Sequence, residues 1–110
     1  MSKQSTMTAE HRRRQSLRVH LETTLHASIS GDRRGTGRVR DLAVGGAFLE
    51  TEQHFEANDS IHVEISSGSQ SFQSDAKVRN ITSLGIGIEF VEMKPDEREH
   101  LRLLITGLLT

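Results

Sequence analysis

Residues 61 to 65 read Ile61-His62-Val63-Glu64-Ile65, an alternation of apolar and polar side chains. Successive side chains of a β-strand point to opposite faces, so this pattern predicts a strand with one buried face. Working outward, segments rich in β-branched or alternating residues predict five more strands at 18–29, 36–42, 46–50, 72–79 and 85–91. Short strands at this spacing, with no helix between them, indicate an antiparallel barrel or sandwich.

The pattern changes only at the end of the chain. Pro95 suits the first position of a helix, and Asp96 and Glu97 favour the positive end of the helix dipole. Apolar residues then recur at helical spacing, at Leu101, Leu104, Ile105 and Leu108. We therefore expect one amphipathic C-terminal helix.

The length of 110 residues fits one compact domain. Residues 1–11 are polar and aperiodic, so burial could not offset the entropy cost of ordering them, roughly 1–2 kcal/mol per residue. We expect a flexible tail at 1–11 and a single domain at 12–110. The sequence has no cysteine, no signal-peptide pattern and no apolar run of membrane-spanning length, which predicts a cytoplasmic protein without membrane insertion.

Charge is distributed unevenly along the chain. Residues 1–40 hold nine basic and three acidic side chains, whereas residues 41–110 hold five basic and twelve acidic ones. This asymmetry indicates that the N-terminal part meets an anionic partner. A nucleic-acid polymer is disfavoured as that partner, because the acidic part would repel it and because the chain has no Trp or Tyr to stack on single-stranded bases.

The sequence offers no catalytic or metal-binding constellation. Its six histidines are scattered without metal-ligand spacing. The glycines at 31, 35 and 37 lack the Lys-Ser/Thr ending of a phosphate-binding loop. We therefore expect no catalytic residue, no metal and no cofactor, in a protein that is not an enzyme.

Two short motifs carry binding chemistry, and the first is the cluster Arg12-Arg13-Arg14-Gln15-Ser16-Leu17-Arg18. It lies where the expected tail meets the first predicted strand. Guanidinium groups are permanently charged, and their planar fork of donors matches phosphate oxygens and the edge of guanine. Taken alone, the cluster also fits a solvated basic tail.

The second motif is Asp41-Leu42-Ala43-Val44-Gly45-Gly46, at the end of the second predicted strand. A carboxylate here can accept two hydrogen bonds from the N1 and N2 donors of guanine, and glycine lets a base or ribose approach the backbone. Taken alone, this motif also fits a simple turn with an aspartate and with glycines at positive φ.

Together the two motifs resemble those of the PilZ family, whose receptors bind cyclic di-GMP, over about residues 10 to 108. In that family an Arg-x-x-x-Arg motif precedes the first strand, and an Asp/Asn-x-Ser-x-x-Gly motif follows the second. Arg14 and Arg18 match the first motif, while Asp41 and Gly46 match the second. Further agreement comes from residues 78–79, 85–90 and 96–98. The resemblance implies an all-β fold, a six-stranded antiparallel β-barrel with a flexible basic N-terminal segment and one C-terminal α-helix.

The resemblance also implies a cyclic di-GMP site and a mechanism. The expected ligand-binding residues are Arg13, Arg14, Arg18, Asp41, Ala43, Gly45, Gly46 and Arg79. In the family, a basic residue directly before the arginine motif goes with a stacked ligand dimer, so Arg13 extends the expectation to two stacked dinucleotides. Ligand binding would order the arginine segment, and an unidentified protein partner would read the changed surface. Bacterial processes that the family serves include motility and adhesion.

Ala43 departs from the family pattern, which has serine at this position. A missing neutral hydrogen bond costs roughly 0.5–1.5 kcal/mol, about a factor of 2 to 13 in affinity, whereas a charge-assisted arginine contact contributes about 1.5–3 kcal/mol. We therefore expect weaker but retained binding. The departure leaves open a second interpretation, a protein-interaction adaptor that binds cyclic di-GMP weakly or not at all.

Overall fold

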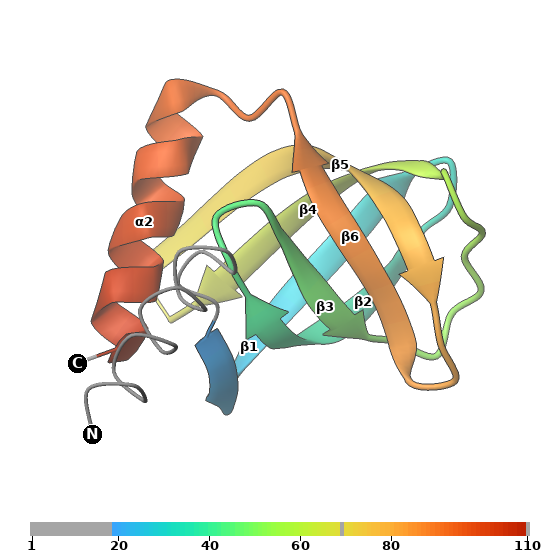
Figure 1. The fold of residues 1–110 in the computed structure, drawn as a ribbon, viewed down its shortest axis with the longest axis horizontal. Helices are drawn as coiled ribbons and strands as arrows, with labels where there is room; N and C mark the ends of the chain where they lie inside the picture. The colour runs from blue at the N-terminus through green and yellow to red at the C-terminus, as the bar shows by residue number, and fades with distance from the viewer. Residues whose placement is uncertain (1–18, 69, 110) are drawn as a thin grey trace, which may run out of the picture.

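Six antiparallel strands form a closed barrel, and one helix packs against it (Figure 1). The computed structural model describes residues 19–68 and 70–109. The elements are β1 (Val19–Gly31), β2 (Gly35–Leu42), β3 (Gly46–Glu50), β4 (Ser60–Ser67), β5 (Gln70–Ile81), β6 (Gly85–Val91) and α2 (Pro95–Leu109). Hydrogen-bonded neighbours follow the order β1-β2-β3-β6-β5-β4 around the barrel. The predicted strands and helix are confirmed, and the choice between barrel and sandwich is resolved in favour of the barrel. The expected tail at 1–11 lies outside the described residues.

Side chains of the strands alternate between the barrel interior and its surface. In β4, Ile61, Val63 and Ile65 are buried, while Glu64 between them is exposed. Burial of one such aliphatic side chain contributes about 1.5–3 kcal/mol, so a slip by one residue would be costly. Buried apolar side chains come from all six strands and from α2, and they form one continuous core.

A β-bulge interrupts this alternation in β2. Val39 lies opposite Leu49, and Asp41 lies opposite Phe48, so Arg40 is an extra residue with no counterpart on β3. A bulge of this kind bends the strand and increases its twist, which helps a small sheet to close. It also shifts the alternation by one position, because Val39 is buried and Asp41, two residues later, is not.

A second bulge lies in β5, which is separated from β2 by β3 and β6. Val78 lies opposite Ile88 and Asn80 lies opposite Gly87, which leaves Arg79 as the extra residue. Val78 is fully buried, whereas Asn80 is exposed. As in β2, the bulge moves a polar side chain that simple alternation would direct inward onto the outer face of the barrel.

The first hairpin is tighter than its glycines predicted. β1 continues to Gly31 and β2 begins at Gly35, so residues 32–34 alone connect them. Gly37 pairs with Ala27 inside the sheet. Gly31 has a φ of 115°, and a Cβ there would lie 2.6 Å from the carbonyl oxygen of Ser60, so both its conformation and its neighbour require glycine.

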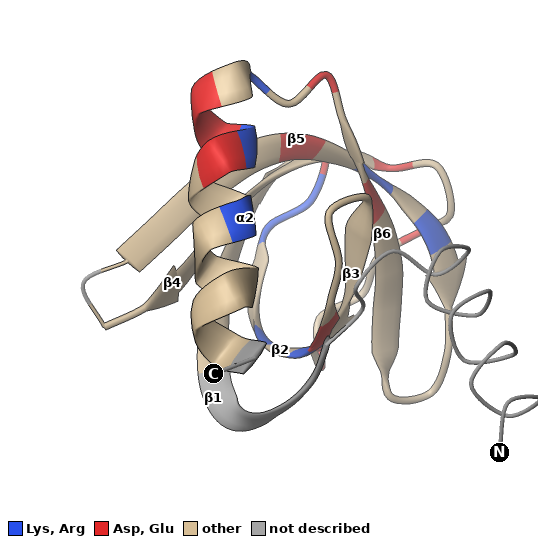
Figure 2. Ribbon diagram, turned by 60° about the vertical axis from the view of Figure 1, so that its left-hand side comes forward, with Lys and Arg blue, Asp and Glu red and all other residues tan. Residues whose placement is uncertain are grey.

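Helix α2 begins at Pro95, as the sequence predicted, and its buried side chains Leu101, Leu104 and Ile105 pack against β5 and β1. The described chain, residues 19–68 and 70–109, contains no helix with the length and hydropathy that a membrane crossing requires. The acidic residues of α2 gather at its N-terminal end, visible in red in Figure 2.

One polar contact fixes the first turn of α2 on the barrel. The backbone N–H of Gln73 in β5 donates to the carboxylate of Glu97 at 3.0 Å. Residues 70–74 of β5 pair with β4 only, because β6 pairs with β5 from Asp75 onward. Glu97 therefore supplies an acceptor for a strand N–H that has no neighbouring strand on that side.

Candidate cyclic nucleotide site

The turn between β2 and β3, residues 43–46, is closed by its own backbone. The N–H of Ala43 donates to the carbonyl of Gly46 at 2.9 Å, and the N–H of Gly46 donates back to Ala43 at 3.4 Å. The N–H of Phe90 in β6 donates to the carbonyl of Gly45 at 2.9 Å. The sharp turn expected at Gly45-Gly46 is confirmed, and it is held against the end of β6.

The two adjacent glycines of this turn have different surroundings. A Cβ at Gly46 would collide with the carbonyl oxygen of Ile88 on β6, whereas a Cβ at Gly45 would have no atom within 4 Å. Neither glycine has a φ in the left-handed region, so the positive φ expected of glycines in a simple turn is absent here. Gly46 is required for close pairing of β3 with β6, while the backbone at Gly45 is open to an approaching molecule.

Ala43, at the position of the motif serine, is buried, with 4% of its surface exposed. Its methyl group therefore offers almost no contact area in this conformation. Val44, the next residue, is 38% exposed at the tip of the turn.

Asp41 lies on the outer face of the barrel because of the bulge at Arg40. Its Cα partners are His20 on β1 and Phe48 on β3. Val19, the first described residue, pairs with Leu42. The N-terminal end of β1 therefore lies beside the end of β2 that leads into the turn. Arg13, Arg14 and Arg18 lie outside the described residues.

Arg79 is exposed and engaged by neighbouring side chains. Its Nε donates to Glu89 at 2.7 Å and one terminal nitrogen donates to Asn58 at 3.3 Å. Glu89 is the Cα partner of Gly46, which brings Arg79 to the region of the turn from the β5 side. Arg79 is therefore an ion-paired residue and not a merely solvated strand charge.

Three further polar residues line the same outer face and were not singled out from the sequence. Arg38 donates to Glu50 at 2.6 Å and Arg40 donates to the other oxygen of Glu50 at 3.1 Å. Two guanidinium groups therefore share one carboxylate next to Asp41. Alternation in 36–42 places both Arg38 and Arg40 on the outer face, and the bulge adds Asp41 to it.

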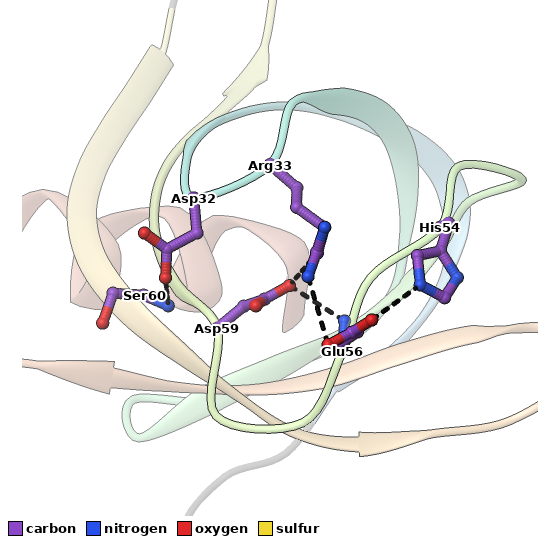
Figure 3. A network of polar contacts seen from close by, with 6 residues as sticks. All are labelled: Asp32, Arg33, His54, Glu56, Asp59 and Ser60. Atoms are coloured by element: carbon purple, nitrogen blue, oxygen red, sulfur yellow. Dashed lines mark hydrogen bonds and ion pairs between the residues drawn. The ribbon is translucent and has the colours of Figure 1, made fainter.

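A polar network joins the β1–β2 connection to the segment before β4 (Figure 3). Arg33 Nε donates to Asp59 at 2.8 Å, and Arg33 also pairs with Glu56 at 3.2 Å. Asp59 is buried, and the hydrogen bonds from the Glu56 backbone N–H and from Arg33 lower its pKa below the ordinary value. The hydrogen bond to Asp59 raises the pKa of Arg33. Arg33 is therefore ion-paired rather than simply solvated, with a partner 26 residues away in the sequence.

His62 on β4 forms a pair with Asp75 on β5 that the sequence did not indicate. His62 Nδ1 lies 2.9 Å from Asp75, and Nε2 lies 2.8 Å from the side-chain oxygen of Gln73. These two acceptors, Asp75 first, raise the pKa of His62 above its ordinary value. The partners become neighbours only through the pairing of β4 with β5.

Two grooves open on the described surface away from the β2–β3 turn, and one of about 560 Å³ is lined by His62, Asp75 and Arg79 among others, so it includes one expected ligand-binding residue. A groove of about 930 Å³ lies at the far end of the β2–β3 hairpin, lined mainly by residues 51–55 and 81–86, and contains none of the expected ligand-binding residues. Residues 19–68 and 70–109 contain no group of three or more His, Asp or Glu side chains that could hold a metal ion.

The geometry of barrel, turn and helix can be compared with known proteins. The family model of the PilZ domain matches residues 12–107. The chain belongs to the PilZ family. PilZ domains are generally receptors for cyclic di-GMP, and they are binding domains rather than enzymes.

Solved structures agree with this PilZ fold. The PilZ domain of CeSA from a cellulose-synthesizing bacterium superposes with a TM-score of 0.67 at 13% identity, covering 84% of this chain and 98% of that one. An uncharacterized Legionella protein superposes with a TM-score of 0.63 at 15% identity, covering 84% of this chain and 92% of that one. Among curated proteins, no sequence matches this chain.

Proposed function

We propose that this PilZ domain is a cyclic di-GMP receptor that orders its N-terminal arginine segment on binding the ligand and signals to a protein partner. The outward position of Asp41 is the observation that carries the proposal. A bulge at Arg40 directs Asp41 to the outer face, beside a turn whose Gly45 backbone is uncovered. Arg18 directly precedes Val19 in the sequence, and Val19 pairs with Leu42, next to Asp41. This adjacency supports a site to which both motifs contribute.

Each motif has its own role in the proposed site. Arg14 and Arg18 pair with the two phosphates, each charge-assisted contact contributing about 1.5–3 kcal/mol. Asp41 accepts hydrogen bonds from N1 and N2 of one guanine, and the open backbone at Gly45 lets the ligand approach closely. Ordering the arginine segment costs about 1–2 kcal/mol per residue, so the ordered form becomes dominant only with ligand.

Two more arginines extend the proposed site. Arg13 neutralises a second, stacked dinucleotide. Arg79 contacts the ligand from the β5 side by exchanging Glu89 for a phosphate or a base edge. No metal or cofactor is needed, because arginines neutralise the phosphates. The receptor acts in the cytoplasm.

Calorimetric titration with cyclic di-GMP at moderate salt tests this function. We expect micromolar binding that is strongly weakened by Asp41→Asn, because the amide nitrogen replaces an acceptor of a guanine donor with a donor. The matched control is Asp32→Asn in the β1–β2 connection, at the far end of β2, which should bind like the wild type. Equal affinity of the two variants would show that Asp41 does not read the guanine.

The second candidate function is a PilZ-like adaptor that works through protein contacts, with weak or absent nucleotide binding. The buried methyl group of Ala43 favours it, because the family's serine hydroxyl is missing there. Under the receptor proposal, Ala43→Ser tightens binding by about 2- to 13-fold, provided that the turn rearranges to expose the hydroxyl. A titration without heat for both wild type and Ala43→Ser would favour the adaptor.

A further inference from the structure

The chain contains four phenylalanines, and the core accounts for three of them. Phe55 and Phe72 are each 2% exposed, and Phe90 packs against the core with its ring perpendicular to that of Phe72, the centroids 5.6 Å apart. Phe48 is different, because it lies between two buried neighbours of β3 and does not belong to the core. One aromatic ring is therefore left on the outer face of the barrel.

Phe48 stands in a row of four residues that crosses four adjacent strands. Asp41 on β2 pairs with Phe48 on β3, Phe48 pairs with Gly87 on β6, and Gly87 pairs with Asn80 on β5. At roughly 4.8 Å between strands, the row is about 14 Å long. Both of its polar ends face outward only because a bulge precedes them, at Arg40 and at Arg79.

Gly87 has no side chain and therefore makes a depression in the middle of this row. A Cβ there would lie 3.1 Å from the amide nitrogen of Asn80, so the Asn80 side chain already reaches over the glycine. The row thus combines a carboxylate, an aromatic ring, a glycine and an amide that lies over the glycine. A flat ring system with hydrogen-bonding edges has complementary chemistry.

Charged hydrogen-bond donors stand next to the row. Arg38 and Arg40 share the carboxylate of Glu50, at 2.6 and 3.1 Å. With Asp41 counted, the two arginines are balanced by two carboxylates, so these four residues carry no net charge. Their guanidinium groups still offer donors to a phosphate attached to a base.

We propose that the ring of Phe48 is the stacking surface for the guanine that Asp41 reads, and that the Asn80 amide contacts the opposite edge of this base. Directly opposed side chains on paired strands have Cβ atoms about 4.5–5.5 Å apart, so a base lying on Phe48 has Asp41 within reach of its edge. The Asn80 amide offers both a donor and an acceptor, which suits an edge with both kinds of group. The inference rests on the proposed receptor function and adds the residues that select the base.

The absence of Trp and Tyr from the chain permits a direct test by fluorescence. Phe48→Trp introduces a single tryptophan, and we expect its emission to be quenched on titration with cyclic di-GMP, because the base stacks on the indole. The control is Leu84→Trp, a single tryptophan at an exposed position in the β5–β6 turn at the far end of the barrel. Its emission should not respond. Unchanged emission of Phe48→Trp in a sample that binds the ligand by calorimetry would overturn the stacking role.

The companion variant Phe48→Leu keeps an apolar side chain and removes the π-face. We expect its affinity for cyclic di-GMP to fall by roughly 5- to 150-fold, which corresponds to the 1–3 kcal/mol typical of base–aromatic stacking. Its urea unfolding curve should match that of the wild type, because Phe48 is outside the core. Wild-type binding with undiminished affinity of Phe48→Leu would refute the inference alone. A wild type that does not bind would refute the receptor function and this inference with it.

Discussion

Substituting Gly46 by alanine tests the structural reason for the last glycine of the motif. Gly46 pairs with Glu89 of β6, and a Cβ at this position would overlap the carbonyl oxygen of Ile88. The atoms nearest to this Cβ all belong to the backbone of Ile88 and Glu89 rather than to a flexible side chain. The clash can be relieved only by moving β3 away from β6, at the point where the barrel closes between them.

The expected cost follows from that movement. Inserting a methyl group into a packed position typically destabilises a protein by about 1–3 kcal/mol, and each strand hydrogen bond that lengthens adds about 0.5–1.5 kcal/mol. For a domain of this size, 1 kcal/mol corresponds to about 4 °C in Tm. We therefore predict that Gly46→Ala lowers Tm by at least about 4 °C, with a parallel decrease in the urea midpoint.

Gly45→Ala is the matched control for this measurement. The Cβ at position 45 meets no atom within 4 Å and the φ is not left-handed, so the folded state accepts alanine without strain. Because alanine restricts the unfolded chain more than glycine does, the variant should be neutral or more stable by up to about 1 kcal/mol. Equal Tm values for the two variants would refute the argument that the β3–β6 contact requires Gly46.

Three further predictions concern stability and protonation. The pKa of Asp59 is lowered from 3.8, so the stabilisation that its carboxylate contributes is present above that pH and is lost as pH falls through the folded-state pKa. Between pH 7 and 3, the free energy of urea unfolding should therefore decline less steeply for Asp59→Asn than for the wild type. The pKa of His62 should exceed 6.5 in an NMR titration and return toward 6.5 in Asp75→Asn, and a wild-type pKa at or below 6.5 would contradict the observed pairing. The stabilisation from this pair is present below pH 6.5 and is lost as pH rises through the folded-state pKa. Glu97→Ala should lower the free energy of unfolding by about 1 kcal/mol because a β5 backbone donor loses its acceptor, whereas Glu99→Ala, whose carboxylate forms only an exposed ion pair, should cost less than about 0.5 kcal/mol.

The strand pattern and the helix could be predicted because burial imposes period 2 on strands and a longer period on α2. The alternation of residues 61–65 is an example, since each apolar residue there is buried. Gly35 and Gly37 both lie in β2, because glycine is compatible with a strand and is favoured where the neighbouring chain is close. At Gly37 a Cβ would lie 2.8 Å from the carbonyl oxygen of Glu50.

The outer face of the site could be predicted only in part. The motif identified Asp41, but simple alternation from Val39 directs residue 41 into the barrel. Residues 38–42 contain no glycine or proline that would indicate the bulge at Arg40. The sequence did not indicate a binding role for Phe48, because a phenylalanine in a strand usually belongs to the core. Its position between Asp41 and Gly87 depends on strand pairing across the barrel, which a local pattern does not contain.

Calorimetric titration of the wild type with cyclic di-GMP, alongside Arg14→Ala and Arg18→Ala, tests the receptor function most directly. Arg34→Ala is the matched control, since it removes the same charge from an exposed position in the β1–β2 connection at the far end of β2. We predict micromolar binding by the wild type and by Arg34→Ala, and its loss in the other two variants. No heat up to about 100 μM ligand, which means an interaction weaker than about −5.5 kcal/mol, would contradict the receptor function.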